Sequence, residues 1–106
     1  FLPLDLKTTS DGFELKAFLP GVNPDDISIQ IVNGVLTFSG EIKVERDEKS
    51  EYILRELPTG KFRRVISLPA PVDADNVEAT LENGVLTVKI PKAEEARGKT
   101  VKIQTK

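Results

Sequence analysis

The sequence contains no cysteine, no histidine and no tryptophan. Without cysteine, the chain has no disulfide framework and no thiol nucleophile. Histidine is the commonest metal ligand and general base, so its absence removes the usual centre of metal or acid–base catalysis. Carboxylates, amines and hydroxyls are the groups left for chemistry. An enzyme is therefore the disfavoured class of function.

Long apolar runs and a strong charge of one sign are also missing. A transmembrane helix needs about 18 or more consecutive apolar residues, and no such run occurs. The net charge of −2 and the pI near 5.2 argue against a general nucleic-acid or membrane-surface binder. No signal peptide is recognisable, so we expect a cytoplasmic protein. The chain begins at Phe1 rather than at methionine, which we interpret as truncation or processing.

The length of 106 residues fits one domain with a modest core. Helix signals are nearly absent, whereas short stretches of alternating apolar and polar residues recur along the whole chain. This pattern predicts an all-β fold, an immunoglobulin-like β-sandwich of seven to nine antiparallel strands.

Two hairpins are predicted from one repeated sequence, Asn-Gly-Val-Leu-Thr, at 33–37 and at 83–87. Asn-Gly is the strongest short hairpin signal, because both residues tolerate the positive φ of a type I′ turn. Alternating arms flank each turn, and Pro91 is expected to end the second hairpin because it cannot donate to a ladder. The two hairpins suggest two sheets, each of which contains one Asn-Gly hairpin.

Alternation predicts further strands over 13–19 and 62–68, and a first edge strand around Leu2, Leu4 and Leu6 that tolerates a proline. Asn23 before a proline predicts the cap of a single helical turn.

The segment 43–59 is highly charged and longer than most connections in a compact domain. Residues 52–57 within it have strand character. Two interpretations remain open: this strand reaches a neighbouring molecule, which we favour, or it lies on the edge of its own sheet.

Arg64 falls on the apolar side of its predicted strand. A guanidinium facing a core is costly unless a carboxylate pairs with it. We therefore expect an ion pair at Arg64, although a side chain near the strand end could also reach water.

Other candidate sites have simpler explanations. Asp25-Asp26 and the pair Asp73 and Asp75 are carboxylate pairs, but calcium needs six to eight oxygens, and turn formation explains both pairs. The basic and aromatic residues of 61–64 could stack RNA, yet a solvated strand face is the better account in an acidic protein. We predict no catalytic residue, metal site or cofactor.

Several blocks of the sequence, in order, resemble the α-crystallin domain of small heat-shock proteins of the bacterial or plant type. The blocks are Leu19-Pro20-Gly21-Val22, Asp25-Asp26-Ile27, Gly34-Val35-Leu36-x-Phe38-x-Gly40, Gly60-Lys61-Phe62-x-Arg64, Leu68-Pro69, and Ala79-x-Leu81-x-Asn83-Gly84-Val85-Leu86 followed by Pro91-Lys92. They cover nearly the whole chain.

The resemblance implies an α-crystallin domain over 1–91 and a C-terminal extension over 92–106. It implies an ATP-independent holdase that binds unfolding client proteins, forms homodimers and assembles further through its tail. The expected dimer interface comprises Leu4, Leu6, Tyr52, Ile53, Leu54 and Arg64. The expected groove for a tail or client comprises Ile27, Ile29, Ile31, Val77, Ala79 and Leu81, and the expected tail motif comprises Val101 and Ile103.

Two other functions remain open at this point. A p23-like co-chaperone domain would share the sandwich but lack the long 43–59 segment and the tail motif. An immunoglobulin-like adhesion or carbohydrate-binding module is a third possibility, disfavoured by the missing cysteine, tryptophan and signal peptide.

Overall fold

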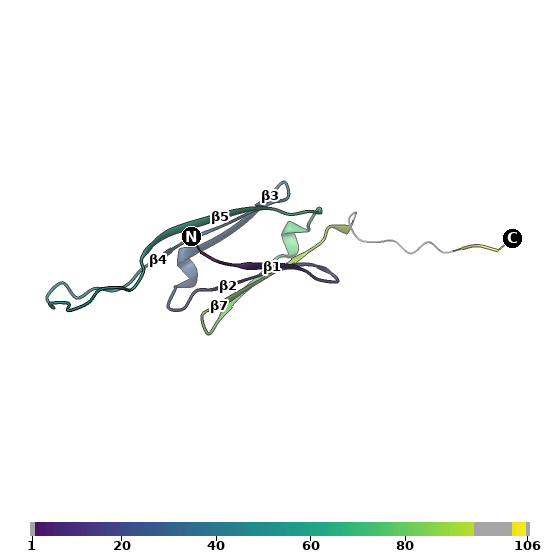
Figure 1. The fold of residues 1–106 in the computed structure, drawn as a ribbon. Coiled ribbons are helices and arrows are strands. Elements are labelled where there is room, and N and C mark those ends of the chain that lie inside the picture. The colour runs from purple at the N-terminus through teal and green to yellow at the C-terminus, as the bar shows by residue number, and fades with distance from the viewer. Residues whose placement is uncertain (1, 95–102, 106) are drawn as a thin grey trace.

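The computed structural model describes residues 2–94 and 103–105, and in this part the chain forms seven strands and two single-turn 3-10 helices. In chain order these are β1 (Asp5–Thr8), β2 (Gly12–Phe18), η1 (Pro24–Asp26), β3 (Ile27–Val32), β4 (Val35–Ile42), β5 (Gly60–Ser67), η2 (Ala74–Asn76), β6 (Glu78–Glu82) and β7 (Val85–Pro91). The strands form two antiparallel sheets, in the orders β1-β2-β7-β6 and β3-β4-β5 (Figure 1). The predicted β-sandwich is confirmed.

Both Asn-Gly turns have the backbone that their sequence predicts. The φ angles are 50° and 75° at Asn33 and Gly34, and 54° and 77° at Asn83 and Gly84. A two-residue turn with positive φ at both positions matches the right-handed twist of the strands that it joins. At the second turn a Cβ on Gly84 would lie 2.9 Å from the Cα of Pro20. Glycine there is required by close packing as well as by backbone conformation.

The predicted helical turn before β3 is η1. Asn23 is its N-cap, and the Asn23 side-chain oxygen accepts a hydrogen bond of 3.0 Å from the Asp25 N–H. Asp25 and Asp26 lie in the first turn, as expected for acidic residues near a helix N-terminus.

The core lies between the two sheets and is entirely apolar in the described part of the chain. Phe38 of β4 is fully buried and packs edge-on against Phe62 of β5, with 5.1 Å between the ring centroids. Gly40 makes room for this ring, because a Cβ there would lie 2.6 Å from the Phe62 ring and 2.6 Å from the Asp26 carbonyl oxygen. The buried apolar residues are Leu2, Phe13, Leu15, Ala17, Leu19, Leu36, Phe38, Phe62, Leu86, Val88 and Ile90.

The first strand begins later than the sequence predicts. β1 starts at Asp5, so Pro3 lies outside the ladder rather than within an edge strand. Leu2 instead places its side chain in the core and its carbonyl oxygen 2.7 Å from the Arg64 guanidinium. This start agrees with the chemistry of proline, which has no N–H to donate to a neighbouring strand.

Candidate functional site

Each sheet has two edge strands whose outer sides are unpaired within the described chain. A contact of Arg64 shows how these edges lie relative to one another. Nη1 of Arg64, on edge strand β5, donates a hydrogen bond of 2.7 Å to the carbonyl oxygen of Leu2, just before edge strand β1. The edges β5 and β1 therefore lie on the same side of the sandwich. The other two edges, β3 and β6, consequently lie on the opposite side, and we call the apolar residues of these two edges (Ile27, Ile29, Ile31, Val77, Ala79 and Leu81) the trough.

Both rims of the trough are apolar. Ile27, Ile29 and Ile31 lie on the inward face of β3, where they pair in register with Gly40, Phe38 and Leu36 of β4. The side chains at this rim are half-buried rather than enclosed, because β3 has no neighbour on its outer edge in the described structure.

The opposite rim comes from β6 and the residue before it. Val77 and Leu81 are half-buried and pack against the core, whereas Ala79 between them is exposed. The recess expected at Ala79 stays a prediction. Five of these six residues lie on the edge strands β3 and β6 and Val77 directly precedes β6, while their role as a groove for a tail or client stays a prediction.

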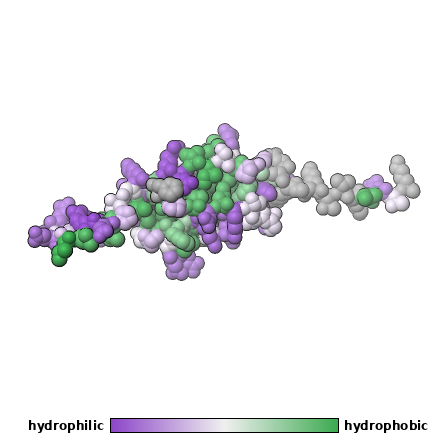
Figure 2. Space-filling model, viewed as in Figure 1, coloured by the Kyte–Doolittle hydropathy of each residue, from purple (hydrophilic) through white to green (hydrophobic). Residues whose placement is uncertain are grey.

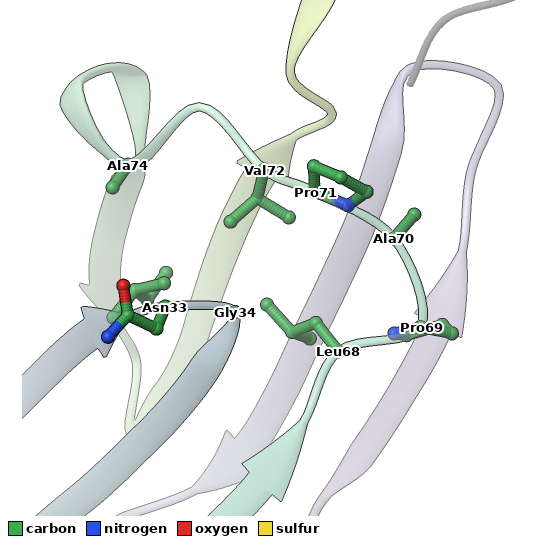
Figure 3. A pocket seen from close by; sticks show the side chains of 9 residues that line it. Asn33, Gly34, Leu68, Pro69, Ala70, Pro71, Val72 and Ala74 are labelled. Atoms are coloured by element: carbon green, nitrogen blue, oxygen red, sulfur yellow. The ribbon is translucent and has the colours of Figure 1, made fainter. Parts of the chain in front are cut away.

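At one end of the trough lies a pocket of about 450 Å³ that the sequence did not predict. Ile31 and the 33–34 turn form one wall, and the connector from Leu68 to Ala74 forms the other. The side chains of Leu68 and Val72 point into the space between turn and connector, and Asn33 provides a polar group at its edge (Figure 3). The connector is held in place because the Leu68 N–H donates to the Gly34 carbonyl oxygen at 2.8 Å.

The connector is also fixed from the other sheet. The Asp73 N–H donates to the Pro91 carbonyl oxygen and the Ala93 N–H donates to the Pro71 carbonyl oxygen, each at 2.9 Å or less. The chain after β7 therefore stays against the connector at least as far as Ala93. A run of prolines between two strands was the available sequence signal for a rigid wall, but its position against the 33–34 turn depends on the tertiary fold.

The side of the sandwich that carries β1 and β5 has a different surface. Leu4 and Leu6 are partly buried and pack against the core. A shallow pocket of about 160 Å³ lies beside Leu4, and its wall includes Phe18, which is 73% exposed. The exposure of the Phe18 side chain follows from the alternation of β2, which directs this side chain away from the core. The sequence analysis did not identify Phe18 as a site residue.

The segment 43–59, which we call the arm, projects away from the sandwich (Figure 1). No strand forms between Lys43 and Thr59, all of which the structure describes. The interpretation that residues 52–57 lie on the edge of their own sheet is therefore wrong. A segment with strand propensity forms a strand only where a partner offers hydrogen bonds, and this chain offers none at that position.

The arm carries hydrophobic side chains in solvent (Figure 2). Tyr52, Ile53, Leu54 and Leu57 are all exposed, and Ile53 is exposed completely, at 103%. Exposed apolar groups on a projecting segment are typical of a contact with another molecule.

Ion pairs fix the base of the arm. Lys43 Nζ lies 3.1 Å from an Asp26 carboxylate oxygen and 3.6 Å from a Glu41 carboxylate oxygen. The hydrogen bond to Asp26 and the negative charges of both carboxylates raise the pKa of Lys43 above its ordinary value. Because all three groups are accessible to solvent, this pairing orients the base of the arm more than it stabilises the fold.

The two carboxylate pairs considered as calcium sites lie at the single-turn helices η1 and η2. In residues 2–94 and 103–105 no group of three or more acidic, histidine or cysteine side chains could hold a metal ion. The Asp73 carboxylate instead accepts a hydrogen bond of 2.6 Å from the Asn76 side chain. Within the same residues, none of the helices has the length and apolar character that crossing a membrane requires.

The structure describes only one of the two residues of the predicted tail motif. Val101 lies outside the described residues. Ile103 is described, and its side chain is 88% exposed.

A sequence profile of the Hsp20/alpha crystallin family matches residues 5–104, nearly the entire chain. The chain belongs to this family. It is 44% identical over 103 residues to small heat shock protein C2 of Rickettsia felis, covering 96% of this chain and 66% of that protein. It is 43% identical over 98 residues to the 17.8 kDa class I heat shock protein of Arabidopsis thaliana, covering 91% of this chain and 62% of that protein.

The structure supports the same assignment. Heat shock protein 16.0 from Schizosaccharomyces pombe superimposes with a TM-score of 0.81 and 34% identity, covering 99% of this chain and 97% of that chain. The predicted resemblance to small heat-shock proteins of bacterial or plant type is confirmed. The chain spans less than two thirds of the length of the two curated relatives, at 66% and 62%.

Within this Hsp20/alpha crystallin chain, the residues predicted for the dimer interface and the groove lie in three places. The trough contains Ile27, Ile29, Ile31, Val77, Ala79 and Leu81. The opposite side contains Leu4, Leu6 and Arg64, while Tyr52, Ile53 and Leu54 lie on the arm and pair with neither sheet. The residues that the sequence analysis missed are Phe18 and the connector residues that line the 450 Å³ pocket.

Proposed function

We propose that this small heat-shock protein is an ATP-independent holdase that binds unfolding client proteins and prevents their aggregation. The observation that carries the proposal is the trough, a set of apolar side chains along β3 and β6, two edge strands whose outer sides are unpaired in the described chain. Edge strands offer free backbone N–H and C=O groups, so an extended apolar segment could bind there by strand addition. Membership of a family whose relatives are named for heat shock supports the same conclusion.

The arm and the β1 edge form the second part of the proposal, a dimer made by exchange of the arm. Residues 52–57 of one copy would pair with the β1 edge of the other, near Leu4 and Leu6. Three observations support it: β1 is an unpaired edge, the arm lies away from its own sheets, and its apolar side chains are exposed. Phe18 and the adjacent 160 Å³ pocket would provide an apolar surface for Ile53 or Leu54.

Assembly beyond the dimer would use the C-terminal extension, residues 92–106, bound in the trough of the domain formed by 1–91. Burying Val101 and Ile103 would contribute roughly 1.5–3 kcal/mol each. Ordering the preceding segment removes part of this gain. About 3–4 kcal/mol remains, which corresponds to a dissociation constant near or above about 1 mM for a single tail.

One such contact cannot hold two subunits together. A dimer carries two tails and two troughs, and linked engagement raises the avidity by orders of magnitude. Association of dimers should therefore be reversible and dependent on concentration, leaving troughs intermittently free for clients. A cytoplasmic site of action stays a prediction from the sequence.

The test compares two exposed positions on the two faces of β6. Ala79→Glu introduces a charge into the trough, whereas Thr80→Glu introduces the same charge on the opposite face of the same edge strand. Both side chains are exposed, so neither change disturbs the core. The readout is light scattering of a thermally unfolding enzyme such as citrate synthase, with no ATP present.

We expect the parent chain and Thr80→Glu to suppress scattering and Ala79→Glu to lose most of this effect. Equal suppression by both variants would show that clients bind elsewhere. Failure of the parent chain to suppress scattering at all would refute the holdase function of this chain.

A further inference from the structure

Tyr52 lies at the centre of a set of contacts within the arm. Its phenolic oxygen accepts a hydrogen bond of 2.7 Å from the Asp47 N–H. The guanidinium carbon of Arg55 lies 5.0 Å from the centre of its ring, and that of Arg46 lies 5.6 Å from the same point. Both distances are within the range of a cation–π interaction. We call these four residues the arm cluster.

Further hydrogen bonds connect the arm cluster to both halves of the arm. The Asp47 carboxylate accepts one bond from the Lys49 N–H at 3.0 Å and another from the Ser50 hydroxyl at 2.6 Å, which closes the turn at the end of the arm. Nη2 of Arg46 donates to the Leu57 carbonyl oxygen at 3.3 Å. Arg46 therefore joins the outgoing half of the arm to the returning half.

This arrangement gives Tyr52 a different environment from its neighbours. Tyr52 is 38% exposed, whereas Ile53 is 103% exposed and Leu54 is 70% exposed. The arm cluster is polar and cationic, so it holds the aromatic ring without covering the aliphatic side chains that follow. The segment most exposed to solvent is also the segment proposed to enter the partner.

We propose that Tyr52 is a positioning residue, which holds the two halves of the arm together and presents residues 53–57 to a second copy of the chain. This inference rests on the proposed dimer made by exchange of the arm. A free arm of 17 residues, 43–59, would sample many conformations, and each residue fixed on binding reduces affinity. Contacts that restrict the arm beforehand remove part of that loss, which is the effect of preorganisation.

The size of the effect follows from the kind of contact. A cation–π interaction at an exposed site changes an equilibrium by about two- to fivefold. Removing both arginines should therefore weaken the dimer by about five- to thirtyfold, mainly through the arm that is no longer restricted.

The chain contains one tyrosine and no tryptophan, so its intrinsic fluorescence reports on Tyr52 alone. Two measurements separate positioning from dimerisation. Time-resolved fluorescence anisotropy in dilute solution, where monomer predominates, measures the local motion of the Tyr52 ring. Sedimentation velocity over a concentration series measures the dimer dissociation constant.

The variants are the double change Arg46→Ala with Arg55→Ala, the conservative change Arg46→Lys with Arg55→Lys, and Lys49→Ala. Lys49 is the matched control, because it lies on the same arm and donates to Asp47 through its backbone N–H rather than through its charged side chain. We expect the double alanine variant to raise the dissociation constant about five- to thirtyfold and to increase Tyr52 motion in the monomer. The lysine variant should recover part of both effects, and Lys49→Ala should change neither.

Three results would overturn the inference. If the double alanine variant dimerises within twofold of Lys49→Ala, the arm cluster does not position the arm. If Tyr52 motion in the monomer is the same in the parent and the double variant, the cluster does not restrain the ring. If the parent chain shows no dimer, exchange of the arm itself is wrong, and the anisotropy of the monomer still shows whether the cluster exists.

Discussion

Replacing Arg64 by alanine should destabilise this small heat-shock protein more than any other change of a single charged side chain in β5. Arg64 lies on the inward face of β5, opposite Phe38, and its guanidinium donates a hydrogen bond of 2.7 Å to the Leu2 carbonyl oxygen. This bond joins one sheet to the chain that enters the other sheet. The sequence predicted a carboxylate partner for Arg64. One contact of its guanidinium is the Leu2 backbone carbonyl, and a carboxylate partner stays a prediction.

The expected loss follows from two terms. A hydrogen bond that involves a charged group contributes about 1.5–3 kcal/mol to stability. Truncation also removes the aliphatic part of the side chain from a half-buried position, where it packs beside the core. We therefore expect a loss of about 2–4 kcal/mol in the free energy of unfolding. For a domain of about 100 residues this lowers Tm by roughly 8–30 °C.

The assay is urea unfolding followed by circular dichroism at several protein concentrations, because dissociation of a dimer would make the midpoint depend on concentration. Arg63→Ala is the control, since Arg63 directly precedes Arg64, carries the same charge and points outward into solvent. It should change the free energy of unfolding by less than about 0.5 kcal/mol. Arg64→Lys keeps the charge but loses the planar donor group, so it should fall between the two alanine variants.

A loss below about 0.5 kcal/mol for Arg64→Ala would refute this reasoning, because it is the usual value for a solvated surface side chain. A large loss that appears only at concentrations where the dimer forms would place the important contact at the subunit interface instead of between Arg64 and Leu2.

Four further predictions test the arm, the tail and the packing. Deleting residues 46–53 should leave a folded monomer in ultracentrifugation, and a dimer of unchanged affinity would exclude exchange of the arm. Replacing Val101 and Ile103 by glycine should remove larger species from sedimentation profiles and leave the dimer intact; collapse of the dimer would make this segment part of its own domain. Gly40→Ala should lower stability by about 1–3 kcal/mol in thermal unfolding, because its Cβ has no room between ring and backbone, and an unchanged Tm would contradict this packing. The Ser50 hydroxyl and two backbone N–H groups in the same turn lower the pKa of Asp47. NMR should therefore show that the turn is intact above the ordinary carboxyl pKa and opens only as the pH falls through the lower pKa of the folded state. Opening at the ordinary carboxyl pKa would refute this prediction.

Much of the local structure could be predicted from the sequence because short-range forces decide it. The Asn-Gly pairs at 33–34 and 83–84 adopt positive φ at little cost, so two hairpins follow without knowledge of the rest of the fold. Asn23 caps the following turn with its own side chain. Alternation also placed Arg64 on the inward face of β5, since the side-chain period of a strand does not depend on its neighbours.

The partners of these elements could not be predicted in the same way. Alternation is the same in a central strand and in an edge strand, so the pairing of β2 with β7, far apart in sequence, came only with the structure. The same limit applies to the pocket between the 33–34 turn and the connector, whose two walls meet only when both sheets are packed.

Residues 52–57 show the division between sequence and tertiary structure most clearly. Their composition favours a strand, yet in this chain they form none and extend into solvent within the arm. The sequence by itself determined where apolar and polar side chains alternate and where the chain turns. Tertiary structure decided which edges stay unpaired, because a strand exists only when a second backbone accepts and donates its hydrogen bonds.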